Sequence, residues 1–191
     1  PVINGDSEIS DNKSMATKGA GIYSINGSAP ELYDVTVSNN YLDRDNLDSL
    51  NVDVSIYGAG IYIKDAYSNS GFIISKLNIS GNHGATGNGS PSSEFWGAGM
   101  YIDQRIGIIN GTTIEQNGIC SAEVSINSCK RPKYGGGIYV SNFSSVDMNN
   151  VDINNNYIYD SPTQHGTGNA IYFDRATNCH LNYVNIDNSN L

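Results

Sequence analysis

A glycine-rich phrase that ends in tyrosine occurs five times in this chain of 191 residues, and it constrains the fold more than any other feature. The copies read GAGIYSIN, GAGIYIKD, GAGMYIDQ, GGGIYVSN and GNAIYFDR. Similarity at such a period is typical of proteins that stack one structural unit on the next. The first glycines of the copies lie at intervals of 39, 39, 38 and 33 residues: Gly19, Gly58, Gly97, Gly135 and Gly168.

A second phrase, apolar-x-x-apolar-x-apolar-x-x-Asn, follows each glycine phrase at a nearly constant distance. The stretch from this Asn to the next glycine varies in length instead, and it covers residues 41–57, 83–96, 118–134 and 157–167. An arc of fixed length followed by a variable one predicts a solenoid with long loops at one corner. The closing asparagines are Asn40, Asn82, Asn117 and Asn156, and Ser189 takes the fifth place.

Both phrases alternate apolar and other residues with a period of two, which indicates strands. Ala59, Ile61 and Ile63 then share an inward face. The phrase tyrosines fall on the outer face beside Gly21, Gly60, Gly99 and Gly137, which should leave a bare groove. The first glycine of each phrase should serve the bend before the strand. The tyrosines are Tyr23, Tyr62, Tyr101, Tyr139 and Tyr172.

These patterns together predict an all-β fold, a parallel β-helix in which coils stack about 4.8 Å apart. The strict six-residue rhythm of the left-handed form is absent, so we expect a right-handed β-helix with three short sheets and five to six coils. Like side chains should then meet along the rod, as a ladder of tyrosines and a ladder of asparagine amides. Residues 1–191 form one domain, and without capping elements at either end we expect a segment of a longer rod.

The paired phrases resemble the right-handed β-helix repeats of certain bacterial surface proteins, namely autotransporter passengers, adhesin-like proteins and polymorphic outer-membrane proteins. Those repeats carry a GGA-I type phrase and an F-x-x-N type phrase, and the likeness covers about residues 3–189. In this chain Val or Ile stands where those repeats carry the aromatic residue of the second phrase. The resemblance implies an extracellular or cell-surface location and a structural or adhesive role.

Charge and composition exclude several classes of partner. The net charge is −9, and because no basic stretch occurs, a nucleic acid should be repelled. No apolar run is long enough to span a membrane. Cys120 and Cys129 lie nine residues apart, so they could form a local disulfide or remain two free thiols. The sequence contains no CxxC motif, so it does not indicate a zinc site.

The same fold also occurs in pectate lyases and pectin hydrolases, so an enzyme that acts on polysaccharides is the alternative function. Such catalysis needs carboxylates from adjacent coils beside an Arg or Lys. The three histidines are scattered, and no such constellation is visible in the sequence. The best candidate for a cation-binding site, with calcium as the expected ion, is an acidic stretch that contains Asp43, Asp45, Asp48 and Asp53. The alternative is that this stretch is a solvated acidic loop.

The variable loops are the expected place for function, and they are rich in aromatic residues. Tyr41, Trp96 and Tyr134 could contact a surface glycan or a protein ligand, or they could fold back and shield a sheet. We therefore expect a non-catalytic rod that displays binding loops and carries no cofactor. A second alternative is a filament subunit that associates with itself through open ends of the helix.

Overall fold

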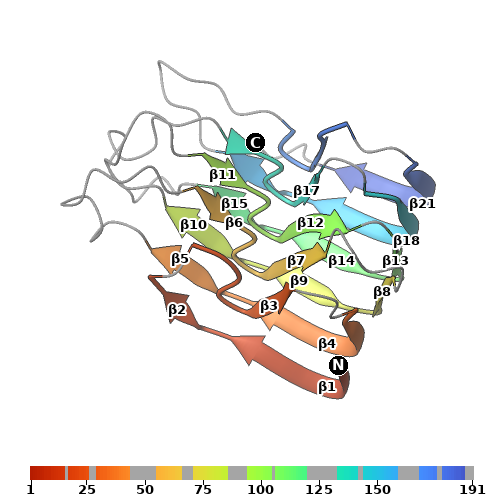
Figure 1. The fold of residues 1–191 in the computed structure, drawn as a ribbon, viewed down its shortest axis with the longest axis horizontal. Helices are drawn as coiled ribbons and strands as arrows, with labels where there is room; N and C mark the ends of the chain where they lie inside the picture. The colour runs from red at the N-terminus through yellow and green to blue at the C-terminus, as the bar shows by residue number, and fades with distance from the viewer. Residues whose placement is uncertain are drawn as a thin grey trace.

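The computed structural model of the protein is built from parallel β-strands (Figure 1), and the residues that it describes form no helix. It describes residues 1–15, 17–25, 29–43, 55–65, 71–85, 94–104, 106–119, 133–141, 144–158, 168–175 and 178–187. The prediction of an all-β fold with parallel pairing is therefore confirmed for these residues.

The strands form four sheets. Sheet A is bent and holds eight strands, namely β1 (Val2–Ser10), β4 (Glu31–Ser38), β8 (Phe72–Ser75), β9 (Asn78–Ser80), β13 (Gly107–Asn110), β14 (Thr113–Glu115), β18 (Val146–Asn154) and β21 (His180–Asp187). Sheet B contains β2 (Lys13–Ser14), β5 (Tyr41–Asp43), β10 (His83–Ala85), β15 (Gly118–Ile119) and β19 (Tyr157–Ile158). Sheet C contains β6 (Ile56–Tyr57), β11 (Phe95–Trp96) and β16 (Lys133–Tyr134). Sheet D contains β3 (Ile22–Ile25), β7 (Ile61–Asp65), β12 (Met100–Gln104), β17 (Ile138–Val140) and β20 (Ile171–Phe173).

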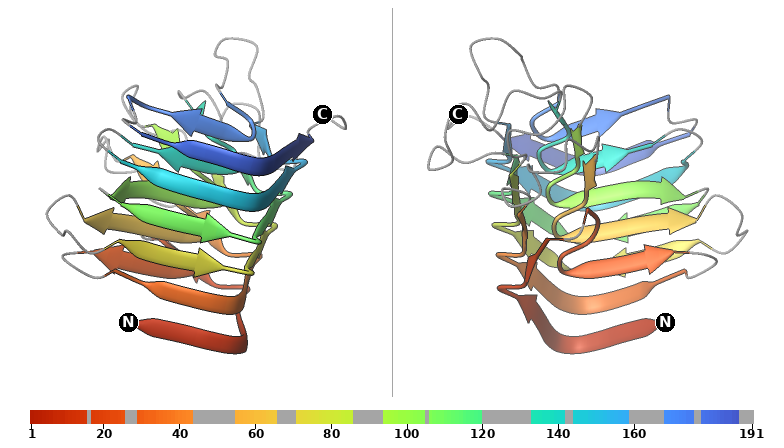
Figure 2. Two further views of the ribbon diagram at one scale, coloured as in Figure 1. Left: turned by 90° about the vertical axis from the view of Figure 1, so that its right-hand side faces the viewer. Right: turned by 60° about the vertical axis from the view of Figure 1, so that its left-hand side comes forward.

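The chain visits the sheets in the order D, A, B and C and then begins again, which is compatible with a solenoid. In both views of Figure 2 the strands of sheet A lie one above another, with β1 and β21 at opposite ends of the stack. The expectation of three sheets is wrong. The fourth, sheet C, arises because the two residues before a glycine phrase pair with their counterparts in the next circuit.

The pairing register confirms the predicted columns of equivalent residues. In sheet D, Met100 pairs with Ile61 on one side and with Ile138 on the other. In sheet A, Ile79 pairs with Val37 and with Ile114. Like residues therefore meet along the stack, which is the condition for ladders of identical side chains.

Each circuit turns at three corners where the backbone adopts a left-handed conformation. At the first corner Gly58 has a φ of 54°, and a Cβ there would lie 2.3 Å from the carbonyl oxygen of Ile61, so only glycine fits. The predicted role of the first phrase glycine at a bend is thus confirmed. The other corners accept longer side chains, as Lys76 (φ 56°) and Gln116 (φ 55°) show.

The buried apolar residues form two clusters inside the stack. The larger one joins sheets A and D through Leu32, Ile61, Ile74 and their equivalents. The smaller one lies by sheets B and C. The expectation that Ala59 shares a face with Ile61 is wrong, because the chain turns at the glycines and Ala59 packs in the smaller cluster: Leu42, Ile56, Ala59, Phe95, Ala98, Ile119 and Ile158.

Candidate functional site

The phrase tyrosines form a continuous stack on the outward face of sheet D. The ring centroids of Tyr62 and Tyr101 lie 5.1 Å apart with an angle of 8° between the ring planes. Tyr101 and Tyr139 are 5.3 Å apart at 4°. Tyr23 at one end and Tyr172 at the other continue the stack at 5.2 and 5.5 Å. The structure thus brings together all five tyrosines of the proposed ladder.

A second column of side chains covers this ladder. Its residues lie in the strands of sheet C and at Lys18, which pairs with Tyr57 in an isolated β-bridge. Tyr57 packs edge-on against Tyr101 at 4.9 Å and at an angle of 77°. Trp96 contacts Tyr57 at 4.4 Å, and Tyr134 contacts Tyr172 at 4.9 Å. At the first circuit the place of an aromatic ring is taken by Lys18, whose Nζ lies over the ring of Tyr57 at 5.6 Å.

The covering column decides how much of each ladder tyrosine is exposed. Tyr62 is 1% exposed, and Tyr101 and Tyr139 are each 6% exposed. Tyr23 is 50% exposed, and it lies at the end of the ladder, where Tyr62 stacks on one of its faces. Tyr57, Trp96 and Tyr134 are half-buried, so they form the accessible surface over the ladder. We call the two columns together the aromatic seam: Lys18, Tyr23, Tyr57, Tyr62, Trp96, Tyr101, Tyr134, Tyr139 and Tyr172.

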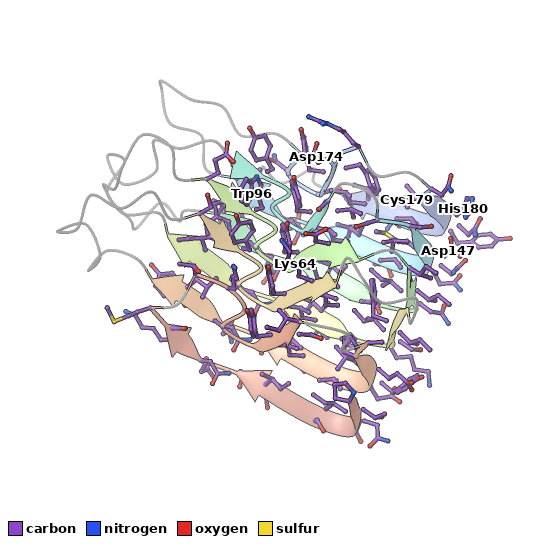
Figure 3. The ribbon with its side chains drawn as sticks, viewed as in Figure 1. Lys64, Trp96, Asp147, Asp174, Cys179 and His180 are labelled. Atoms are coloured by element: carbon purple, nitrogen blue, oxygen red, sulfur yellow. The ribbon has the colours of Figure 1, made fainter. Side chains whose placement is uncertain are left out.

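A row of polar side chains runs along the other side of the ladder, two residues after four of the five ladder tyrosines, and Ile25 takes this place after Tyr23. The Lys64 ammonium lies 3.2 Å from the Asp103 carboxylate, and the Tyr139 hydroxyl donates a hydrogen bond of 2.9 Å to Asp174. Figure 3 shows Lys64, Trp96 and Asp174 on the face of the molecule that carries the seam. Sequence reasoning missed this polar row, although its fixed offset from the tyrosines is a readable signal: Lys64, Asp103, Ser141 and Asp174.

Burial within the seam changes the acidity of its phenols. It raises the pKa of Tyr62, Tyr101 and Tyr139 above the ordinary range, mainly because the phenolate would be desolvated. The Asp103 carboxylate adds to the pKa increase of Tyr101, and the hydrogen bond to Asp174 adds to that of Tyr139. The phenols of Tyr62, Tyr101 and Tyr139 are therefore neutral hydrogen-bond donors at neutral pH.

The closing asparagines form a second ladder, which is fully buried. The Asn82 amide donates hydrogen bonds to Oδ1 of Asn117 at 2.9 Å and to the carbonyl oxygen of Val37 at 2.8 Å. The links from Asn40 to Asn82 and from Asn117 to Asn156 are also 2.9 Å long. All four side chains have no exposed surface, so this ladder holds the stack together and is inaccessible to ligands.

The expected bare groove beside the tyrosines does not exist. A Cβ on Gly60 would lie 2.9 Å from Cγ of Asn82 and 2.6 Å from the carbonyl oxygen of Gly99. Gly21, Gly99 and Gly137 contact their own asparagines in the same way. The glycines therefore provide the space that the asparagine ladder fills.

Sheet B carries another column of polar and aromatic side chains. Tyr41, which we expected to bind a ligand, lies on β5 with Lys13 Nζ 5.4 Å from its ring centroid. In the circuits above, the Tyr157 hydroxyl lies 3.0 Å from Nδ1 of His83. Desolvation lowers the pKa of His83, so the imidazole is neutral at neutral pH, and its tautomer sets which of the two groups donates this hydrogen bond. This column thus pairs its own groups with one another.

The structure does not test several sequence predictions, because they fall outside the described residues. Asp45, Asp48, Asp53 and the proposed Cys120–Cys129 disulfide lie there, as does the side chain of Asp43. Within the described ranges no group of three His, Cys, Asp or Glu side chains could hold a metal ion. These ranges also contain no helix with the length and apolarity needed to cross a membrane.

Trp96 and Tyr134 are the predicted loop aromatics that the structure places in a common site. Both lie against ladder tyrosines and are half-buried, so they cover the ladder and keep an accessible surface. His180 is exposed and pairs with Asp147 at 2.8 Å. Cys179 is a free thiol packed against the larger core cluster. Neither residue lies among the seam contacts.

The seam offers neutral phenols, half-buried rings and a neighbouring row of charged and hydroxyl groups, repeated along the stack. Such a surface can bind by stacking and hydrogen bonding. Comparison of the chain with protein-family models, with curated proteins and with solved structures finds no match.

Proposed function

We propose that the chain is a right-handed parallel β-helix that serves as a non-catalytic binding segment of an extracellular, adhesin-type surface protein. Parallel strands joined by crossover connections in one sheet are right-handed in about 98% of cases, which supports the handedness. The ladders support the rod, because they hold each circuit to the next at fixed distances.

The observation that carries this proposal is the place where the variable sequence segments leave and rejoin the stack. Each follows a strand of sheet B, and three of the four return to a strand of sheet C. The strands β5, β10, β15 and β19 are neighbours, as are β6, β11 and β16. Variation in length is thus greatest in the segments that follow sheet B, while the rest of each circuit varies by only a few residues. A rigid frame with variable segments at one side is a common arrangement for recognition.

The test of this proposal has a binding arm and a turnover arm. Intact chain is applied to an array of immobilised glycans and extracellular-matrix proteins, beside a variant in which residues 44–54 are replaced by a Gly-Ser linker of equal length. We expect retention on at least one ligand and weaker retention of the variant. In the turnover arm, polygalacturonate and xylan are incubated with the chain, and new chain ends are measured. Depolymerisation that disappears on replacement of a single carboxylate would reject the non-catalytic role.

Self-association is a second candidate function, and the last strand of sheet A favours it. Leu181 and Ile186 on β21 are 45% and 50% exposed, although their partners Met148 and Ile153 on β18 are fully buried. An apolar strand edge of this kind can pair with another strand. Sedimentation velocity over a hundredfold range of concentration tests this. Assembly that Leu181→Lys abolishes would support the candidate, and monomers at every concentration would reject it.

A further inference from the structure

The aromatic seam has chemical features that the proposed function does not use. Its covering rings are half-buried, and at the first circuit Tyr23 is 50% exposed. Lys64 and Asp174 remain accessible beside it, with side-chain exposures of 51% and 39%. A surface that needed only to be sealed would not place charged and hydroxyl groups in a row along the stacked rings.

The seam also repeats along one direction. The ladder rings follow one another at 5.1 to 5.5 Å. Each circuit adds one ring, and each circuit from Tyr62 onward also adds one member of the polar row. A ligand that matches every circuit must itself repeat along a line. A folded protein surface rarely has such translational symmetry, whereas a polysaccharide repeats one sugar ring after another.

Charge selects among repeating polymers. The chain carries a net charge of −9, so an anionic polymer is repelled at long range. Within the seam the Lys64 ammonium is already neutralised by Asp103 at 3.2 Å. The other ammonium of the seam, that of Lys18, lies over the rings of Tyr57 and Tyr62 at 5.6 and 5.7 Å. The remaining groups are phenols, carboxylates and a serine hydroxyl, which bind hydroxyl groups, while the rings suit the apolar face of a sugar.

We propose that the aromatic seam is a binding site for a neutral polysaccharide, which lies along the stack with its sugar rings over Tyr57, Trp96 and Tyr134 and its hydroxyl groups toward the polar row. This inference rests on the proposed function and names the ligand class and the surface that binds it. The variable segments are not required for this contact, so the two proposals can be tested separately.

The chain contains a single tryptophan, Trp96, so its fluorescence reports directly on the seam. The intact chain is mixed with insoluble cellulose, chitin, mannan and starch, and retention is measured by sedimentation. Soluble oligosaccharides of any retained polymer are then titrated while the emission of Trp96 is followed. We expect saturable retention on at least one polymer and a saturable change in emission.

Trp96→Ala and Tyr134→Ala should each weaken retention by about tenfold, since each removes one stacking ring. Tyr183→Ala is the matched control, because this ring is 88% exposed on β21 in sheet A and contributes nothing to the seam. Thermal unfolding of each variant checks the fold. Trp96→Phe keeps a ring and should restore most of the retention if Trp96→Ala is unstable.

Two results would overturn the inference: retention on none of the four polymers, or retention that neither ring variant weakens. The proposed function survives both if the linker variant of residues 44–54 still lowers binding on the array. The proposed function fails instead if the array retains nothing or if the chain depolymerises its ligand.

Discussion

The side-chain amide of Asn82 donates a hydrogen bond of 2.9 Å to Oδ1 of Asn117, although the two residues lie 35 positions apart in the sequence. The Oδ1 of Asn82 in turn accepts hydrogen bonds from the backbone and the side chain of Asn40, at 3.1 and 2.9 Å. One buried side chain therefore joins three successive circuits, and the stability of the stack should depend on it.

Replacing this residue tests that dependence. Asn82→Ala removes four hydrogen bonds, two donated and two accepted, so buried groups of Val37, Asn40 and Asn117 each lose a partner, although Oδ1 of Asn117 still accepts from the backbone of residue 82. Because each such group costs about 1–3 kcal/mol, we expect the free energy of unfolding to fall by at least about 3 kcal/mol. Urea unfolding measures the change. The control is Asn78→Ala on the neighbouring strand, where the side chain is exposed and the change should stay below about 0.5 kcal/mol.

The tyrosine ladder should contribute to stability through its stacking and its burial. Tyr101→Ala deletes a ring that is 6% exposed and stacked on both sides, so we expect a loss of about 3–5 kcal/mol. Tyr101→Phe keeps the ring and loses only the hydroxyl, which should cost about 1 kcal/mol. Equal losses for the two variants, measured by thermal unfolding, would show that stacking contributes little.

Alkaline pH should weaken the protein through the same rings. The pKa values of Tyr62, Tyr101 and Tyr139 are raised in the folded state, mainly by desolvation, whereas a tyrosine in the unfolded chain has a pKa of about 10. The unfolded state therefore loses its protons first as the pH rises. The stability that these neutral phenols contribute is complete below pH of about 10 and is lost above it.

Urea unfolding measured between pH 8 and pH 11 tests the predicted fall in the free energy of unfolding. We expect the free energy of unfolding to fall steeply above a pH of about 10, and less steeply in Tyr101→Phe because one titrating group is gone. A slope that Tyr101→Phe leaves unchanged would mean that other groups cause the alkaline loss.

Much of this arrangement could be predicted from the sequence, because the stack repeats the same residue at the same place. The pairing of Tyr62 with Tyr101 and of Asn82 with Asn117 follows from alignment of the phrases alone. The left-handed backbone conformation at a corner could also be predicted where only glycine fits, as at Gly58. Local repetition thus determines which residues meet.

Other features depend on how separate arcs pack, and alignment within one arc cannot reveal them. Gly60 looks like an empty position in its strand, and only the return of the chain at Asn82 fills the space. The sequence also does not show that Tyr57 and Trp96 pack over the ladder, since two-residue strands have no detectable period. The candidate site was therefore only partly predictable: its rings were identified, but not their cover or the polar row.

Acid should weaken the protein through His83. Desolvation lowers the pKa of this imidazole in the folded state, and the Tyr157 hydroxyl lies 3.0 Å from Nδ1. The unfolded imidazole takes up a proton near a pH of about 6.5, so the stability contributed by the neutral ring is present above that pH and is lost as the pH falls. His83→Phe should have a smaller difference in unfolding free energy between pH 7.5 and pH 5. An identical difference in both proteins would assign the acid loss to carboxylates.

Two glycine positions separate the effect of a clash from that of backbone strain. A Cβ on Gly60 would meet the Gly99 carbonyl oxygen at 2.6 Å and the Asn82 side chain at 2.9 Å, and neither can move without breaking the ladder. Gly111 has a φ of 55°, but its Cβ would lie 3.7 Å from the nearest atom, in Lys76, and Lys76 occupies the same corner one circuit earlier. We expect Gly60→Ala to lower the free energy of unfolding by about 3 kcal/mol or more, and Gly111→Ala by only about 1 kcal/mol. Urea unfolding of both variants compares them directly. The reverse order would mean that the glycines are selected for their backbone conformation and that the asparagine ladder can yield to an added methyl group.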